Sequence, residues 1–155
     1  MIPGVMPMVE TRAFVIQDRT SAVVAASQAQ RFALRWGLPA RRATELAIVV
    51  SELASNIVKH GVSGEIRLLW DPGVPPRGEI TVEAHDVGPP IHDLEMAMTD
   101  GYDDRGPIDP ALVLRRRGLG TGLGAVARLA DRLEYRLKHG ENEDGKVLTA
   151  RFLLR

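Results

Sequence analysis

The sequence feature that most constrains the fold is a long helical pattern that runs from Pro39 to His60. At about 100° per residue, its apolar residues gather on one broad face, and charged and amide residues form a narrow stripe opposite or beside that face. A helix of this kind needs a second layer over its apolar face, because helices in water gain most of their stability from such packing. The apolar residues are Ala43, Leu46, Ala47, Val50, Leu53, Ala54 and Ile57, and the polar stripe is Glu45, Glu52, Asn56 and Lys59.

The second layer is predicted to be a β-sheet. The clearest strand covers Glu79 to His85, where apolar and polar residues alternate along the chain. Further strands are expected at 11–17, 65–70, 133–138 and 147–154, and further helices from a capping segment at 18–21 to about 36, at 92–99 and at 122–132. Because two pairs of strands follow each other directly, we expect antiparallel pairing and an α+β fold. The predicted architecture is a two-layer sandwich with helices on one face of a mixed, mostly antiparallel sheet.

Composition narrows the range of functions. The chain has 155 residues, so we expect a single domain over 1–155 with a flexible N-terminus at 1–10. Lys and Arg number 20, as do Asp and Glu, so the net charge gives no support to a nucleic-acid partner. The absence of cysteine excludes disulfides and thiolate metal sites and fits a cytoplasmic setting. No apolar stretch is long enough to span a bilayer, so no membrane partner is expected.

The polar stripe contains a pair of residues that suits metal and proton chemistry. Glu52 and Asn56 are four residues apart in the helical pattern, so their side chains project together. Asn is a mediocre residue for the middle of a helix, because its side chain competes with the backbone for hydrogen bonds. Its side-chain oxygen can coordinate Mg²⁺, which prefers oxygen ligands, and the Glu52 carboxylate can accept a proton from an attacking hydroxyl or water. The alternative is an ordinary solvated helix face.

A second candidate follows the clearest strand. Asp86 stands at the strand end, and Gly88 comes two residues later. A carboxylate in this position can accept a hydrogen bond from a purine amino group, and a glycine lets a base approach the backbone closely. The alternative is ordinary turn chemistry, since Asp and Gly are common in turns.

The third candidate is an alternating run of glycines, Gly118, Gly120, Gly122 and Gly124, at the start of the helix predicted at 122–132. Alternating glycines bare the backbone N–H groups, and a helix N-terminus adds positive potential, so such a segment can cradle phosphates. Ordering these glycines loses much conformational entropy, which a bound ligand would offset. The alternative is a flexible loop with a helix cap. Taken together, the three motifs point to ATP and Mg²⁺.

Two other phosphate-binding motifs do not fit this run. A P-loop ends in Gly-Lys-Ser/Thr, and no lysine lies near these glycines. A dinucleotide fingerprint can be forced onto residues 122–127, but it should follow a strand within a βαβ unit. Here an arginine cluster at 115–117 and an irregular segment come before the glycines. We therefore expect neither a P-loop nor a dinucleotide-binding fold.

The order of these motifs, ExxxN, then DxG, then a long lid and GxGxGxG, resembles the Bergerat-fold (GHKL) ATPases. This group contains gyrase, Hsp90, histidine kinases and MutL. The short chain and the run from Glu45 to Gly61 look like the stand-alone anti-sigma regulatory serine/threonine kinases of the RsbT and RsbW type, with the RsbT type nearest. The resemblance covers nearly the whole chain, from about Thr11 to Arg155.

The resemblance implies a role for each matching position. Glu52 matches the catalytic base, Asn56 the Mg²⁺ ligand and Asp86 the adenine-reading carboxylate. Around the nucleotide it implies Gly88, Gly118, Gly120, Gly122, Gly124 and, near the adenine in the last strand, Thr149. It further implies that the protein uses ATP and Mg²⁺ to phosphorylate a serine or threonine of a STAS-domain protein in a bacterial partner-switching module. By analogy, such modules act in stress responses.

The chain also departs from the family pattern. Pro90 stands where the first glycine box usually has its second glycine, which would stiffen the pocket wall. The predicted lid, residues 101–117, is longer than is typical of the RsbT type and carries Arg105 and the cluster at 115–117. A lid arginine such as Arg105 can meet the γ-phosphate with two hydrogen bonds. The alternative for these arginines is a solvated basic loop that contacts an acidic partner.

Two other functions stay open beside the kinase. The chain can be a non-catalytic switch module that sequesters a sigma factor, a PP2C-type phosphatase or a STAS-domain protein. It can also be the ATP-binding half of a histidine kinase. The last is disfavoured, because the chain has no room for a dimerisation helix pair with a phospho-accepting histidine.

Overall fold

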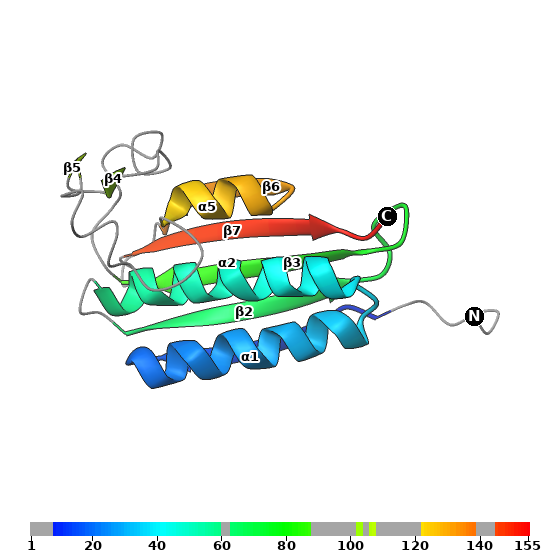
Figure 1. The fold of residues 1–155 in the computed structure, drawn as a ribbon, viewed down its shortest axis with the longest axis horizontal. Coiled ribbons are helices and arrows are strands. Elements are labelled where there is room, and N and C mark those ends of the chain that lie inside the picture. The colour runs from blue at the N-terminus through cyan, green and yellow to red at the C-terminus, as the bar shows by residue number, and fades with distance from the viewer. Residues whose placement is uncertain (1–7, 60–62, 88–101, 104–105, 108–121, 139–144) are drawn as a thin grey trace.

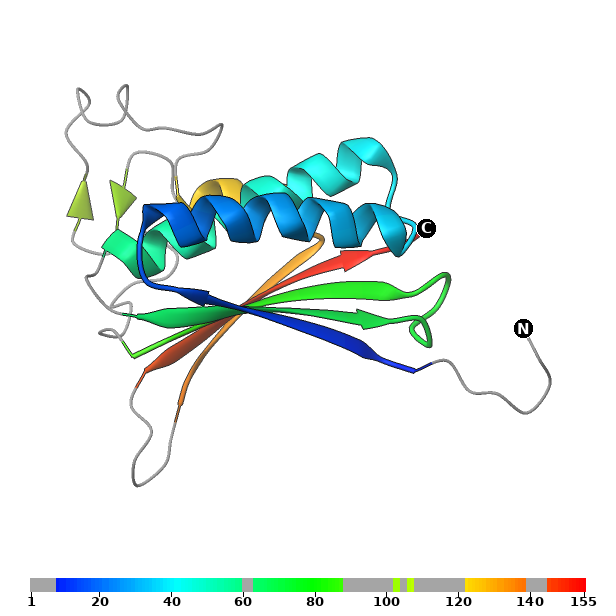
Figure 2. The ribbon, with the colours of Figure 1, turned by 90° about the horizontal axis from the view of Figure 1, so that it is seen from below.

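The computed structural model describes residues 8–59, 63–87, 102–103, 106–107, 122–138 and 145–155. In these ranges three helices lie on one face of a five-stranded sheet (Figure 1, Figure 2). The predicted α+β sandwich is confirmed. None of the helices in the described part of the chain combines the length and the apolar character that a membrane crossing requires.

The sheet has the strand order β1-β2-β3-β7-β6, and each of its neighbouring strands pairs antiparallel. Its strands are β1 (Glu10–Ile16), β2 (Gly64–Asp71), β3 (Glu79–Asp86), β6 (Arg132–Leu137) and β7 (Lys146–Leu153). The helices are α1 (Arg19–Arg35), α2 (Ala40–Lys59) and α5 (Leu123–Leu129). Two short strands, β4 (Tyr102–Asp103) and β5 (Gly106–Pro107), pair with each other in a second sheet.

These short strands fall in the segment 101–117, which was predicted to be an irregular lid. The rest of that segment, the helix predicted at 92–99 and most of the N-terminal stretch predicted to be flexible lie outside the described residues. The five strands of the main sheet and the first two helices overlap their predicted ranges almost completely. Local sequence patterns were therefore sufficient to find the main elements.

Local chemistry explains where α1 begins and ends. Asp18 is extended, and its carboxylate accepts a hydrogen bond of 2.8 Å from the backbone N–H of Ser21. The Ser21 hydroxyl in turn accepts one of 3.1 Å from the backbone N–H of Asp18, which completes a capping box. After the helix, Gly37 has a φ of 104°, which glycine adopts without steric cost, and the chain turns there toward α2.

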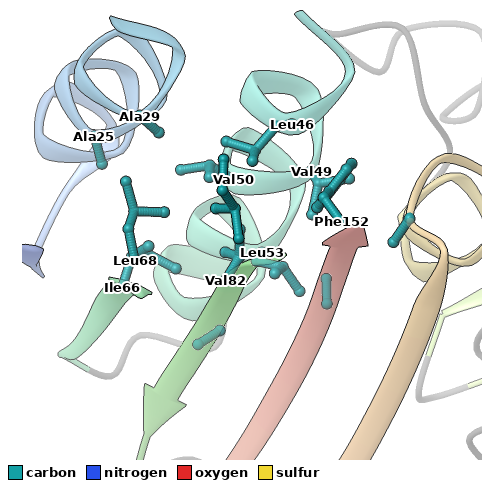
Figure 3. Packing of buried hydrophobic residues seen from close by; sticks show 14 of the residues in the cluster. Ala25, Ala29, Leu46, Val49, Val50, Leu53, Ile66, Leu68, Val82 and Phe152 are labelled. Atoms are coloured by element: carbon teal, nitrogen blue, oxygen red, sulfur yellow. The ribbon is translucent and has the colours of Figure 1, made fainter. Parts of the chain in front are cut away.

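The core lies between the sheet and the two long helices (Figure 3). The buried residues of α1 are all alanines, so this helix can approach α2 and the sheet closely. α2 supplies larger side chains such as Leu46, Val50 and Leu53, which are fully buried against strand residues that include Leu68 and Val82. Burying each side chain of this size stabilises the fold by roughly 1.5–3 kcal/mol. The core thus holds α2 in a fixed position on the sheet.

Helix α5 is shorter than predicted. It ends at Leu129, whereas the sequence pattern predicted a helix as far as Arg132. Ala130 is extended, with a ψ of 152°, and the backbone N–H of Asp131 donates to the carbonyl of Arg151 on β7 at 2.9 Å. Pairing with β7 therefore begins at this point and outweighs the local preference for helix.

Candidate functional site

The elements that carry the predicted site residues meet at one end of the molecule. α2 and β3 end there, and β7 and α5 begin there (Figure 1). Strand register sets Asp86, the last residue of β3, opposite Gly64 on β2 and Lys146 on β7. A Cβ added at Gly64 would lie 3.0 Å from Cγ2 of Ile57 in α2 and 3.1 Å from Cβ of Asp86. The last turns of α2 therefore pack close to the end of β3.

The predicted pair Glu52 and Asn56 lies in the second half of α2. Both residues are half-buried, while their neighbours Leu53, Ala54 and Ile57 are buried in the core. Helix geometry keeps side chains four residues apart on one face. The pair thus stands at the border between core and solvent, on a helix that packing holds rigidly.

Asp86 is almost fully buried and forms an ion pair with Lys146. Lys146 Nζ donates to Asp86 Oδ1 at 3.0 Å, and the two side chains are 1% and 4% exposed, respectively. Removing two charges from water costs on the order of several kcal/mol per ion, which close pairing offsets. The start of β7 therefore supplies a cationic hydrogen-bond donor directly beside the predicted base-reading carboxylate.

Lys146 was not among the residues predicted for the site, although the sequence holds a signal for it. Counting back from Phe152 through Ala150 and Leu148, which are core residues, strand alternation reaches Lys146 on the same face. We predicted that this strand begins at Val147, so Lys146 fell between the strand and the preceding turn. Its partner is 60 residues away in the chain, which no local pattern can show.

Thr149 is not brought together with Asp86. In the strand register it stands opposite Glu83 on β3 and Glu134 on β6. Side chains alternate between the two faces of a strand, so Thr149, three residues after Lys146, projects to the sheet face away from the helices. The residue on β7 that faces Asp86 is Lys146.

Only part of the glycine run lies in the described ranges. Gly122 directly precedes α5 with a φ of 81°, a conformation that favours glycine, and Gly124 is buried in the first turn of that helix. Gly88, Arg105, Gly118 and Gly120 lie outside the described residues. Their contacts with a nucleotide stay predictions.

A further glycine shapes this end of the sheet. Gly145 has a φ of 133°, and a Cβ at this position would collide with the backbone oxygen of Asp86 and lie 3.0 Å from Cα of Val87. Because position 145 is a glycine, the backbone just before β7 can lie directly against the end of β3 that carries Asp86.

The described part of the chain holds no cluster of three or more His, Cys, Asp or Glu side chains that could bind a metal. The described residues therefore give no support to a metal site built from protein ligands alone. The side-chain oxygen of the half-buried Asn56 is of the kind that binds a Mg²⁺ ion shared with a nucleotide. In such sites one or two protein oxygens bind the ion, and phosphates and waters complete its octahedron.

Comparison with known proteins agrees with this arrangement. The chain is 32% identical over 101 residues to the serine/threonine-protein kinase RsbT of Bacillus subtilis (strain 168). The aligned segment covers 64% of this chain and 65% of RsbT, so the chain spans slightly less than two thirds of that relative's length. Residues 16–152 match the family described as histidine kinase-like ATPase domain, a range that contains α2, β3, α5 and nearly all of β7. The chain therefore belongs to the histidine kinase-like ATPase domain family.

Proposed function

We propose that this protein is an ATP-dependent protein serine/threonine kinase of a bacterial partner-switching module, and that it phosphorylates a STAS-domain protein. The observation that carries the proposal is that the last turns of α2 pack close to Asp86 at the end of β3, and that α5 begins at the same end of the fold. Membership of the ATPase family and the similarity to a serine/threonine-protein kinase support ATP as phosphate donor and a hydroxyl side chain as acceptor.

Glu52 is the proposed general base. Its half-buried position on α2 holds the carboxylate at a fixed place while leaving it accessible. It would accept the proton of the substrate hydroxyl while that oxygen attacks the γ-phosphorus and the bond to the leaving ADP breaks. A positioned base typically contributes about 10²–10⁴-fold in rate.

Asn56 is the proposed Mg²⁺ ligand. Its side-chain oxygen would bind the ion, and Mg²⁺, when bound, supplies positive charge that offsets the negative charge of the phosphates. Because Asn56 lies one helical turn from Glu52 on the same face, the ligand and the base would reach the triphosphate from the same wall of the site.

The nucleotide contacts complete the proposal. Asp86 would accept a hydrogen bond from the adenine amino group. The backbone of the glycine run would contact the phosphates, and a lid arginine would reach the γ-phosphate. The residues proposed for these contacts are Gly88 near the base, Gly118, Gly120, Gly122 and Gly124 at the phosphates, and Arg105 in the lid. We leave Thr149 out of the proposal, because strand alternation puts it on the sheet face away from Asp86.

The kinase proposal can be tested by phosphate transfer. The purified chain is incubated with Mg²⁺ and γ-labelled ATP together with its cognate STAS-domain protein, and labelled phosphoserine or phosphothreonine is measured. We expect transfer by the wild type and a loss of about 10²-fold or more in Glu52→Gln. A matched control is Glu45→Gln, since Glu45 lies in the same stripe but at the other end of α2, where it pairs with Arg41 and Arg42.

The control should keep transfer close to the wild-type rate. Absence of transfer by the wild type, or a Glu52→Gln variant as active as the wild type, would reject the kinase.

A non-catalytic switch module is the second candidate. The observation that favours it is the engagement of Asp86 by Lys146, which occupies one oxygen of the carboxylate. In that case the chain would sequester a STAS-domain protein, a sigma factor or a PP2C-type phosphatase. Tight partner binding that survives Asp86→Asn, without phosphate transfer, would favour this function over the kinase.

A further inference from the structure

We propose that Lys146 is a second base-reading residue, and that with Asp86 it makes the site accept 6-oxopurine nucleotides as well as 6-aminopurine nucleotides. The inference rests on the proposed binding of a nucleotide base at Asp86. It adds a specificity that the carboxylate alone would not have.

The geometry of the pair supports this role. Asp86 and Lys146 stand directly opposite each other in the β3–β7 register, and both side chains project to the helix face of the sheet. Their charged atoms, Oδ1 and Nζ, are 3.0 Å apart. A base that reaches the carboxylate of Asp86 therefore also meets the ammonium group of Lys146.

The two groups have opposite hydrogen-bonding capacities. An ionised carboxylate only accepts hydrogen bonds, and an ammonium group only donates them. Adenine offers an amino donor at position 6, whereas guanine offers a carbonyl acceptor there. A carboxylate alone would thus bind the amino group of adenine and repel the carbonyl oxygen of a 6-oxopurine.

With Lys146 present, both kinds of base find partners. Adenine would donate its 6-amino hydrogen to Asp86 and accept from Lys146 at ring nitrogen N1. Hypoxanthine, which carries a carbonyl at position 6 and a hydrogen on N1, would accept from Lys146 and donate to Asp86. The neighbouring donor and acceptor only exchange their order along the edge of the base.

The expected difference is large enough to measure. A site rejects an analogue by about 10⁴-fold when that analogue leaves a buried polar group of the site without a hydrogen-bond partner. With a donor and an acceptor side by side, we expect the dissociation constants of the two nucleotides to differ by less than about tenfold, which is 1.4 kcal/mol.

The first experiment uses the wild-type chain and titration calorimetry with Mg²⁺-ADP and Mg²⁺-inosine diphosphate. The inosine nucleotide is the sharpest probe, because it differs from ADP only at position 6 and at the N1 hydrogen. Dissociation constants within about tenfold of each other support the inference. Binding of ADP with a larger loss for the inosine nucleotide overturns it and leaves the nucleotide site intact. Binding of neither nucleotide rejects the proposed site itself, and the inference falls with it.

The second experiment compares variants at Lys146. Lys146→Met removes the hydrogen-bond donor and should raise the ratio of the two dissociation constants at least about tenfold. Lys146→Gln keeps a neutral N–H donor and should stay near the wild-type ratio. The matched control is Arg136→Met, which removes a cation from the neighbouring strand β6, where Arg136 is exposed and stands opposite Val147.

The outcomes at Lys146 decide between recognition and a structural role. A purely structural ion pair predicts the same nucleotide ratio in all folded variants, and this result would overturn the inference. A Gln variant that discriminates as strongly as the Met variant would also overturn the assignment of a donor. If neither variant folds, the wild-type ratio decides alone.

Discussion

Ion pairs join distant parts of the chain at both ends of the fold, at the start of α2 and between β3 and β7, but the pairs differ in burial. Near the start of α2, Arg42 donates to the carbonyl of Leu129 at 2.7 Å and to the carboxylate of Asp131 at 3.1 Å, and it also pairs with Glu45. The charged side chains of this network are 18–27% exposed. At the other end, Asp86 and Lys146 are almost completely removed from solvent.

The difference in burial determines how much each group of charges contributes to the stability of the fold. A partly exposed network keeps much of its hydration, and here Arg42 also satisfies the end of α5 by binding a carbonyl oxygen. A buried pair loses its hydration, so apolar residues of similar volume often stabilise a protein as well or better. Stability alone therefore does not account for the pair at the site end, which agrees with the role in ligand recognition proposed for it.

The largest expected effect comes from breaking the buried pair. Lys146→Met leaves the Asp86 carboxylate buried without its cation, and the free energy of unfolding should fall by about 3–5 kcal/mol. Urea denaturation followed by circular dichroism measures this loss. In the double variant Lys146→Met/Asp86→Leu most of the stability should return, because no buried charge is left. A single variant as stable as the wild type would show that the pair is not desolvated in solution.

A smaller effect is expected at the start of α2. Arg42→Met removes hydrogen bonds to Leu129 and Asp131 and a contact with the ring of Phe152, so the free energy of unfolding should fall by about 1–3 kcal/mol. Binding of ADP should not change, because Arg42 is remote from Asp86. The matched control is Arg41→Met, since Arg41 is 90% exposed and should change stability by less than about 0.5 kcal/mol. Equal losses of unfolding free energy in the two variants would show that positive charge near the helix start, and not the hydrogen-bond network of Arg42, stabilises the fold.

The same contrast explains which parts of the molecule could be predicted from sequence. The Glu52–Asn56 stripe and the end of β3 were found because helical and strand periodicities are local. The end of α5 was misplaced because Asp131 joins β7 through a bond to Arg151, a residue far along the chain. A local sequence pattern cannot show that pairing with a distant strand competes with continuation of the helix.

The base-reading end of the site was predicted only in part for the same reason. Asp86 was identified from its place after a strand, but its partner on β7 depends on which strands are neighbours and on their register. Thr149 was assigned from the family resemblance, which places a threonine near the adenine in the last strand. The register puts Lys146 opposite Asp86 and Thr149 on the other face.

The smallest expected effect is at a fully exposed hydrogen bond between a carboxylate and a backbone N–H group, which completes the series of decreasing burial. The backbone N–H of Ser21, which Asp18 binds at the start of α1, lowers the pKa of Asp18 below its ordinary value of 3.8. A pKa that is lower in the folded state gives a contribution to stability that is complete above about pH 3.8 and is lost as the pH falls through the lower, folded value. Asp18→Asn keeps a capping side chain without the charge, so its melting temperature should lie slightly below that of the wild type at pH 7, and the difference should shrink as the pH falls to 3. Thermal unfolding of both proteins at the two pH values measures this difference, and a difference that does not change with pH would show that the charge of Asp18 contributes nothing to the cap.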